Sequence, residues 1–359
     1  MVYFELSRMD NLQDYIPIQR ELTRRGYNSS FVVRENVKKW NSIYTFDDIR
    51  EVFAFTDNII DSSNINLNII DGIVFCINID TKLISSNLIN FSIMQRLDWN
   101  IDYEQVVSNV DYCIFAGEEF YKQFGLQSKK HLSFGNPMFD DVNDEGFVYT
   151  KFNLDSFKKY CLVLLPNRLN NFHPDDYQFS HQDLLNIYTY LQDLGYTIIT
   201  KTRPKTVKLY GEFDDKFLGD VHVVSSSYPN ETLELLQISD LCLMFSSTAI
   251  SESYRMKVPT IDLKIKPYQG NDFLLDNRTY VRIDDWKNIK YERVRTIISG
   301  MEKRKSIYFN TGINKYFPKG KSCELCVDFL EENYMEKLVC NGIDVNDGHK
   351  IKMRMLGLI

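Results

Sequence analysis

The side chains most suited to binding a ligand follow the apolar run 241–245, which ends in three hydroxyl residues and is followed by a carboxylate. The hydroxyl residues are Ser246, Ser247 and Thr248, and the carboxylate is Glu252. In a parallel α/β sheet, a strand that turns directly into a helix presents backbone N–H groups to an anion. A carboxylate one turn into that helix can accept hydrogen bonds from sugar hydroxyls. The pattern therefore predicts a site for a diphosphate joined to a ribose.

Three cations could reach the same site from two other predicted strand ends. Arg168 follows a strand predicted at 160–165, and Lys201 and Arg203 follow one predicted at 196–200. Parallel strands bring their carboxyl ends to one edge of the sheet, so these side chains can converge. Two or three cations would neutralise a diphosphate. The alternative is a solvated basic turn, but the serine turn and Glu252 favour the binding site.

The cysteine pair Cys323 and Cys326 has a spacing that metal and redox sites use. It lies in an amphipathic helix pattern without a second pair nearby, and Cys340 is a poor third ligand, so a structural role is favoured. The sequence has no Asp-x-Asp triplet of the kind that holds Mg²⁺. We therefore expect no metal site.

The order of predicted elements indicates how these residues are positioned. Strands and helices alternate in both halves of the chain, which predicts two parallel-sheet α/β domains facing each other across a cleft. The expected domains are 1–141, a linker at 142–155, 156–320, and a C-terminal helix and tail at 321–359 that pack back. The predicted strands are 2–7, 30–34, 51–55, 72–79, 111–116 and 131–134 in the first half, and 160–165, 196–200, 221–225, 241–245 and 259–263 in the second.

Bulk properties exclude several classes of protein. At 359 residues the chain is too long for one ordinary core. No run approaches the roughly 18 apolar residues that a membrane span needs, and the N-terminus has no signal-peptide pattern. A net charge of −7 argues against a nucleic-acid partner. Four cysteines lie in apolar runs, as reduced thiols do, which favours the cytoplasm; they are Cys76, Cys113, Cys161 and Cys242.

Two blocks of sequence carry a resemblance to a known superfamily. Residues 246–252, followed by Lys257, Val258 and Pro259, resemble the nucleotide-binding segment of GT-B glycosyltransferases and of the related UDP-N-acetylglucosamine 2-epimerases. Residues 111–115 through the Gly-Asn-Pro-x-x-Asp junction at 135–140 are similar to the last strand–helix–strand of the first domain in those proteins. The resemblance implies a GT-B-like fold of two Rossmann-like domains with a nucleotide-sugar between them.

Departures from the superfamily pattern bear on the activity. The glycine-rich turn after the first strand is missing, which keeps an inactive nucleotide-binding protein among the alternatives. Ser251-Glu252 keeps only one carboxylate of the epimerase pair, and the first half shows no counterpart of the epimerase's catalytic acids; both favour transfer over epimerisation. The CDP-glycerol phosphotransferases of wall teichoic acid synthesis share the architecture, and their Lys-x-His-Pro step is Lys-Thr-Arg-Pro at 201–204 here. The alternatives are thus a nucleotide-sugar 2-epimerase, a CDP-glycerol-type phosphotransferase, or an inactive nucleotide-binding protein.

The leading hypothesis is a metal-independent glycosyltransferase for surface polysaccharide, with a UDP- or CMP/CDP-linked donor and no other cofactor. The resemblance implies that the cations and hydroxyl residues hold the diphosphate and that Glu252 holds the ribose. A base from the first domain must take the acceptor proton. Asp10 and Asp98 are the candidates; these two, like Asp14, would more commonly be surface carboxylates.

The expected acceptor is a glycan or a lipid-linked chain. The tail 349–356 is basic and apolar together, as in segments that touch an anionic membrane, although packing or fraying is the more common role of such a terminal segment. We therefore expect a cytoplasmic protein, with a peripheral position at the inner face of the membrane as a further expectation.

Overall fold

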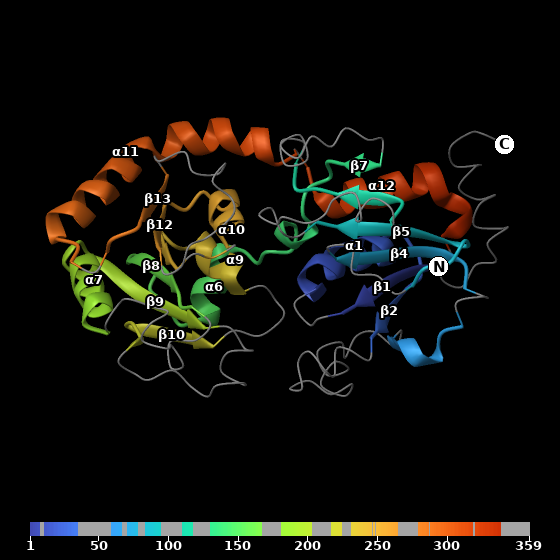
Figure 1. The fold of residues 1–359 in the computed structure, drawn as a ribbon, viewed down its shortest axis with the longest axis horizontal. Coiled ribbons are helices and arrows are strands. Elements are labelled where there is room, and N and C mark those ends of the chain that lie inside the picture. Colours follow the sequence, from blue (N-terminus) through green and yellow to red (C-terminus); the bar gives the residue numbers. More distant parts are fainter. Residues whose placement is uncertain are drawn as a thin grey trace. The chain divides into compact units, whose positions relative to one another are not determined.

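The computed structural model describes two compact units. Unit 1 consists of Met1–Gln95, Ile101–Asp141 and Pro318–Ile359, and unit 2 of Arg96–Asn100 and Val142–Phe317 (Figure 1). Within them, the residues whose structure is described are 1–7, 11–34, 59–66, 70–77, 83–94, 110–117, 130–166, 181–202, 217–224, 231–245, 247, 249–264, 279–286, 288–318 and 320–338.

The sheet of unit 1 has the strand order β3-β2-β1-β4-β5-β6-β7, and its described pairs are all parallel. Its inner strands are buried along their whole length because both faces of a parallel sheet are covered. The strands are β1 (Val2–Leu6), β2 (Ser29–Val33), β3 (Ile59–Asp61), β4 (Gly72–Ile77), β5 (Leu88–Ile93), β6 (Tyr112–Ile114) and β7 (His131–Leu132).

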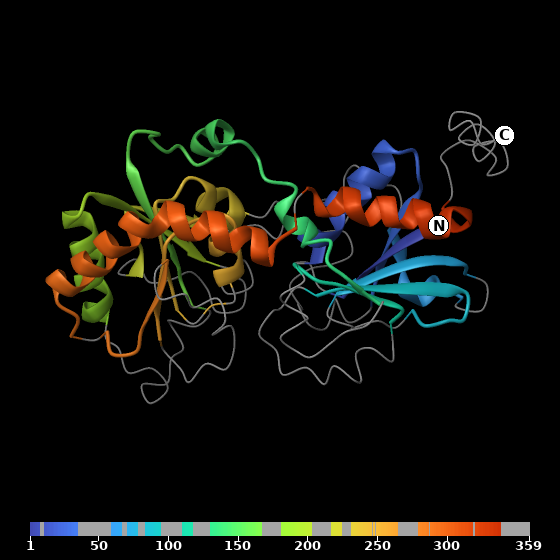
Figure 2. The ribbon, with the colours of Figure 1, turned by 90° about the horizontal axis from the view of Figure 1, so that it is seen from above.

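Two helices from opposite ends of the sequence lie side by side on one face of this sheet, α1 (Leu12–Arg24) and α12 (Ser322–Tyr334) (Figure 2). The face beneath them carries a row of rings, in which Phe4 lies 5.2 Å from Phe31 and 5.4 Å from Phe75 between ring centroids. Tyr15 of α1 packs 5.2 Å from Phe4. The short helices of this unit are η2 (Ser62–Asn64), η3 (Pro137–Phe139) and η7 (Met335–Lys337).

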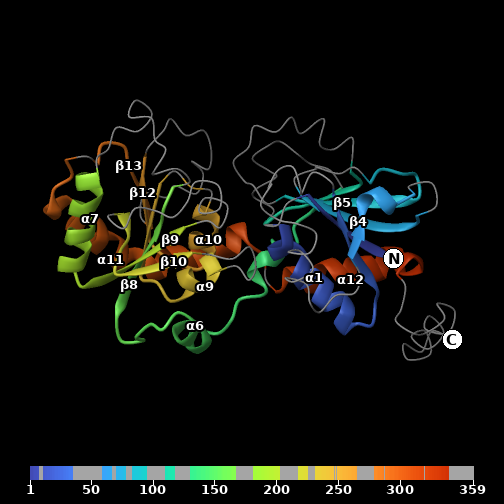
Figure 3. The same cartoon turned by 90° about the horizontal axis from the view of Figure 1, so that it is seen from below.

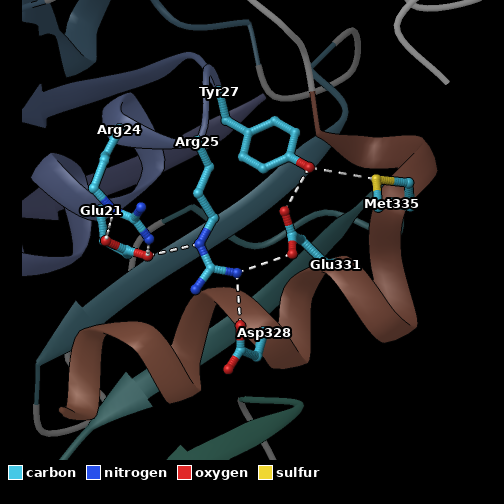
Figure 4. A network of polar contacts seen from close by, with 7 residues as sticks. All are labelled: Glu21, Arg24, Arg25, Tyr27, Asp328, Glu331 and Met335. Atoms are coloured by element: carbon cyan, nitrogen blue, oxygen red, sulfur yellow. Dashed lines mark hydrogen bonds and ion pairs between the residues drawn. The ribbon is translucent and has the colours of Figure 1, made fainter. Parts of the chain in front are cut away.

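A network of charged side chains joins α1 to α12 (Figure 4). Arg25, at the end of α1, lies 2.6 Å from Asp328 and 2.9 Å from Glu331, both on α12. The same guanidinium contacts Glu21 at 2.6 Å, and Tyr27 donates to Glu331 at 2.7 Å. The C-terminal helix therefore belongs structurally to the unit that begins the chain.

The sheet of unit 2 has the order β10-β9-β8-β11-β12-β13, again with parallel pairs. Helices α7 and α11 cover one face, and α9 and α10 the other (Figure 1). The strands are β8 (Lys159–Leu164), β9 (Tyr196–Thr202), β10 (Val221–Val224), β11 (Leu241–Met244), β12 (Thr260–Leu263) and β13 (Tyr280–Ile283). The helices are α6 (Glu145–Lys151), α7 (His181–Asp193), α9 (Glu231–Gln237), α10 (Ile250–Arg255) and α11 (Tyr291–Tyr316).

Each sheet reverses its strand order at one place. In unit 1 the reversal falls between β1 and β4, and in unit 2 between β8 and β11. The connections leave the two strands at a reversal in opposite directions, and open α/β sheets commonly bind ligands outside the carboxyl ends of the strands at such a place. Figure 3 shows the unit 2 strands β8 to β13 from below.

The predicted α/β class with two parallel sheets is confirmed, while several details differ. Strands β3, β5 and β13 were not predicted from the sequence. Strand β5 was missed because the buried polar residues Asn90 and Ser92 interrupt its apolar pattern. The expected linker, 142–155, contains the helix α6, whose Val148 is buried. The strand predicted at 51–55 lies outside the described residues.

Candidate functional site

A row of five residues crosses the unit 2 sheet near the carboxyl ends of its strands. In register it runs Lys201, Leu164, Met244, Asp262 and Arg282. Residues paired in this way point to the same face of the sheet, here the face opposite the core that α7 and α11 cover. Neighbouring strands are about 4.8 Å apart, so the backbone at Lys201 lies about 10 Å from the backbone at Met244, on the other side of the β8–β11 reversal.

The turn after β11 is held by local hydrogen bonds. Ser247 Oγ accepts from the backbone N–H of Ala249 at 3.2 Å, which shapes the approach to α10. Further along α10, Ser253 Oγ accepts from Thr260 Oγ1 of β12 at 2.9 Å and donates to the Ile250 carbonyl at 3.0 Å. These bonds fix the rotation of this short helix against the sheet. The Ser247 hydroxyl is used as an acceptor and still carries a donor hydrogen.

Glu252 projects from α10 and is oriented by its neighbour in the sequence. Ser251 Oγ donates to Glu252 Oε2 at 2.9 Å, and Ser251 is 8 % exposed. The carboxylate lies within electrostatic range of Cys242 on β11: burial raises the pKa of the Cys242 thiol well above its ordinary value, and the charges of Glu252 and Asp262 add to the rise. The Glu252 carboxylate is thus close enough to β11 to affect the ionisation of a thiol on that strand.

A buried polar triad next to this site was missed from the sequence. Tyr280 donates to Asp262 Oδ2 at 2.5 Å, and Arg282 Nε donates to the same oxygen at 3.2 Å. Burial, followed by the charge of Asp262, raises the pKa of Tyr280. The available signal was a charged residue at the centre of an apolar strand, since Asp262 is buried and such a group needs a paired charge.

The predicted site residues are therefore brought together only in part. Lys201, Ser247 and Glu252 lie at the carboxyl edge of one sheet: Lys201 is on β9, one strand away from the β8–β11 reversal, and Ser247 and Glu252 follow β11. The other predicted residues fall outside the described part of the chain; they are Asp10, Asp98, Arg168, Arg203, Ser246 and Thr248.

Unit 1 carries its own charged cluster at the carboxyl ends of β1 and β2. Arg34 Nε lies 2.7 Å from Glu5 Oε1, with side chains 5 % and 1 % exposed. Tyr15 donates to the Glu5 carbonyl at 3.0 Å, and burial raises the pKa of Tyr15. Asp14 is fully buried, so the expectation of a surface carboxylate was wrong for this residue. The reason is its position in the first turn of α1, where the positive end of the helix stabilises a carboxylate.

Among the described residues, no cluster of three or more His, Cys, Asp or Glu could hold a metal ion. Burial raises the pKa of Cys323 to about 12, with Asp140 adding to the effect, and raises that of Cys326 as well. Both thiols stay protonated at neutral pH, which fits the structural role predicted for this pair. No described helix combines the length and the apolar character that crossing a bilayer would require.

Comparisons of sequence find no protein-family model that matches the chain and no curated protein that is similar to it. Comparisons of structure find extensive similarity. A UDP-N-acetylglucosamine 2-epimerase from Listeria monocytogenes, itself assigned provisionally, superposes with a TM-score of 0.59 at 12 % identity, over 93 % of this chain and 96 % of the other.

Two further structures extend the comparison. The wall teichoic acid polymerase TagF soaked with CDPG gives a TM-score of 0.64 at 12 % identity, over 94 % of this chain and 90 % of the other. The UDP-GlcNAc 2-epimerase of Methanocaldococcus jannaschii, in complex with UDP-GlcNAc and UDP, gives 0.58 at 14 % identity, over 92 % and 99 %. These structures and the two doubly wound sheets described above share one architecture, so the chain has the GT-B fold.

Proposed function

We propose that the chain is a GT-B-type glycosyltransferase that binds a nucleotide-activated sugar at the carboxyl edge of the unit 2 sheet. The observation that carries the proposal is the reversal of strand order between β8 and β11, with Lys201 on β9, one strand from the reversal, and Glu252 on the helix α10 that follows β11. Ligands of open α/β sheets bind at such a reversal. The fold shared with enzymes that act on or bind UDP- and CDP-linked compounds supports the same placement.

In this proposal different kinds of side chain bind the diphosphate and the ribose of the nucleotide. Lys201, with Arg168 and Arg203, neutralises the diphosphate, and the hydroxyls of 246–248 donate to its oxygens. Glu252 accepts from the ribose hydroxyls through a carboxylate that Ser251 holds in place. The nucleotide is thus fixed at both ends, which sets the position of the sugar that it carries.

The reaction in this proposal is a displacement at the sugar. The acceptor oxygen forms a bond to the anomeric carbon, the bond from that carbon to the diphosphate oxygen breaks, and the acceptor proton goes to a carboxylate base. The cations of unit 2 stabilise the charge that develops on the leaving diphosphate. Asp10 and Asp98 remain the proposed bases. The proposed acceptor is a glycan or a lipid-linked chain at the inner face of the membrane.

Two related activities fit the same nucleotide site, and the products separate them. A nucleotide-sugar 2-epimerase converts UDP-N-acetylglucosamine alone into a new isomer, whereas a transferase needs an acceptor. A CDP-glycerol-type phosphotransferase releases CMP from CDP-glycerol when an acceptor is supplied. Incubating the protein with each donor, with and without acceptors, and identifying the products therefore assigns the activity. An inactive nucleotide-binding protein would bind these donors and convert none.

The nucleotide site itself is tested by calorimetric titration with UDP and CDP. Glu252→Ala should weaken binding of the preferred nucleotide at least about tenfold, because bonds from the ribose to a charged acceptor are lost. Glu302→Ala is the matched control: it removes a carboxylate on α11 that contacts Lys159 at the opposite end of the strands, and should leave affinity unchanged. Equal affinities of Glu252→Ala and the wild type, in a folded protein, would contradict the assignment.

A further inference from the structure

We propose that Ser251 is a positioning residue that sets the Glu252 carboxylate for recognition of a cis-diol, the ribose of the nucleotide. The inference rests on the proposed nucleotide site and adds a second residue to its specificity. Its basis is the 2.9 Å hydrogen bond from Ser251 Oγ to Glu252 Oε2, made by a serine that is itself buried.

The geometry of this bond is informative because the two residues are adjacent on a helix. Side chains at i and i+1 project in different directions and do not normally face each other. For the bond to form, the Glu252 side chain must fold back along its own helix toward Ser251. The hydrogen bond from Ser251 therefore favours one arrangement of a side chain that has several rotatable bonds.

The helix that carries the pair is also fixed against the sheet. Thr260 of β12 donates to Ser253 Oγ at 2.9 Å, and the Val258 N–H donates to the Ser253 carbonyl at 2.9 Å. The position of Glu252 relative to β11 thus follows from two successive constraints, helix on strand and carboxylate on helix. A carboxylate held in this way is preorganised: it has its binding orientation before the ligand arrives.

Holding the carboxylate in one orientation before binding adds more affinity for a diol than for a single hydroxyl. An unrestrained glutamate loses side-chain freedom when it binds, and a bond that already holds it removes part of that loss. A carboxylate has about four acceptor positions on its two oxygens, and the bond from Ser251 uses one of them. Two oxygens held in one orientation can then accept from two neighbouring hydroxyls. A nucleotide that lacks the two ribose hydroxyls would gain no affinity from the orientation of this carboxylate.

The test measures how strongly the protein prefers a ribonucleotide to its dideoxy form. A general loss of stability would weaken the binding of both forms and would leave this preference unchanged. Dissociation constants of UDP and 2′,3′-dideoxy-UDP, and of the CDP pair, are measured by calorimetry, and the ratio within each pair is the readout. Ser251→Ala should reduce the ratio by about threefold to tenfold, the worth of one hydrogen bond, mainly by weakening the ribonucleotide. Ser251→Cys, which keeps the size and weakens the donor, should give a reduction of the same sense.

Ser239→Ala is the matched control, because it removes another buried hydroxyl of unit 2, one that donates to the Leu235 carbonyl at 2.6 Å at the end of α9 rather than on α10. It should lower the melting temperature and leave the ratio unchanged. If the wild type binds neither UDP nor CDP, or does not discriminate against the dideoxy forms, the ribose assignment itself fails. If the wild type discriminates and Ser251→Ala discriminates equally well, only the positioning role of Ser251 is overturned.

Discussion

At the scale of single residues, Lys201 combines burial with a position at the proposed diphosphate. It is 7 % exposed and lies at the carboxyl end of a strand one place away from the β8–β11 reversal. A lysine is seldom buried to this extent, because removing an ammonium group from water is unfavourable. Little water screens such a charge, so its attraction for a bound diphosphate would be strong.

The corresponding prediction concerns the charge rather than the shape of this side chain. Lys201→Met keeps the buried stem and removes the ammonium, so affinity for UDP or CDP should fall about tenfold or more. Lys201→Arg should retain part of the affinity. Calorimetry with a melting curve for each variant checks this; unchanged affinity in Lys201→Met would make Lys201 a structural residue only.

The buried cysteines give a second prediction at this scale. Burial raises the pKa of Cys113 to about 12, and burial with Asp140 raises that of Cys323 to about 12, from an ordinary value of 9.0. At pH 8 the thiolate fraction is then about a thousandfold below that of an exposed thiol. Mass spectrometry after iodoacetamide treatment should find both residues unmodified in the native protein and modified after unfolding.

At the scale of elements, the docking of α12 on α1 depends on charge. Hydrogen bonds from Arg24, and then from Arg25, lower the pKa of Glu21 from 4.5 to about 2. A lowered pKa means that the stabilisation is present above pH 4.5 and is lost as the pH falls toward 2. The shift corresponds to at most about 3 kcal/mol, which screening around the exposed Arg24 side chain reduces to about 1 kcal/mol.

Glu21→Gln should therefore destabilise the protein by about 1 kcal/mol at pH 7 and by progressively less between pH 4.5 and 2. Urea unfolding of variant and wild type across this pH range is the measurement. Two curves that stay parallel down to pH 2 would show that the Glu21 charge does not support the docking of α12.

Gly135 is the second contact of α12 that can be tested. Its φ is +93°, and a Cβ there would lie 2.3 Å from Ser322 Oγ and 3.1 Å from Pro318. Gly195 has a similar φ of +87°, but a Cβ would meet nothing within 4 Å. The pair separates backbone strain from steric overlap with α12.

Gly195→Ala should cost about 1 kcal/mol, because alanine is strained in a left-handed backbone, and Gly135→Ala about 2–4 kcal/mol because overlap is added. The double variant Gly135→Ala with Ser322→Ala should regain part of the difference, since the nearest clashing atom is removed. Equal destabilisation by the two single glycine variants, measured by chemical denaturation, would exclude the overlap.

At the scale of the whole molecule, the described part of the chain passes from unit 1 to unit 2 at 141/142 and returns to unit 1 at 317/318. Each unit has its own core, and such units commonly unfold in separate steps. Leu330 of α12 and Leu243 of β11 are fully buried in units 1 and 2 respectively. Either substitution by alanine should destabilise its own unit by about 2–5 kcal/mol.

Calorimetric scans should therefore show two transitions, one lowered by Leu330→Ala and the other by Leu243→Ala. A nucleotide that binds at the β8–β11 edge should raise the transition that Leu243→Ala lowers, because the ligand stabilises only the unit that binds it. A single transition lowered equally by both substitutions would show instead that the two units unfold as one.

Much of this fold can be predicted from the sequence, because buried parallel strands are continuous apolar runs and glycines mark the ends of their helices. The runs at β8, β11 and β12 and the hydroxyl turn after β11 are enough to locate one border of the candidate site. Strand β5 is missed because Asn90 and Ser92 are polar, and β13 because Arg282 is charged. Such polar groups are compensated by partners elsewhere in the chain, such as Asp262 for Arg282.

The sequence by itself thus determined the class of the fold and the residue types at the carboxyl edge of the unit 2 sheet, since local patterns of burial and turn chemistry specify both. Only the tertiary structure decided that Ser251 contacts Glu252, that Asp14 is buried, and that α1 is the helix on which the returning α12 packs. The physical reason is that these features depend on which groups meet in space. Contacts between residues far apart in the chain leave no periodic trace in the sequence of either partner.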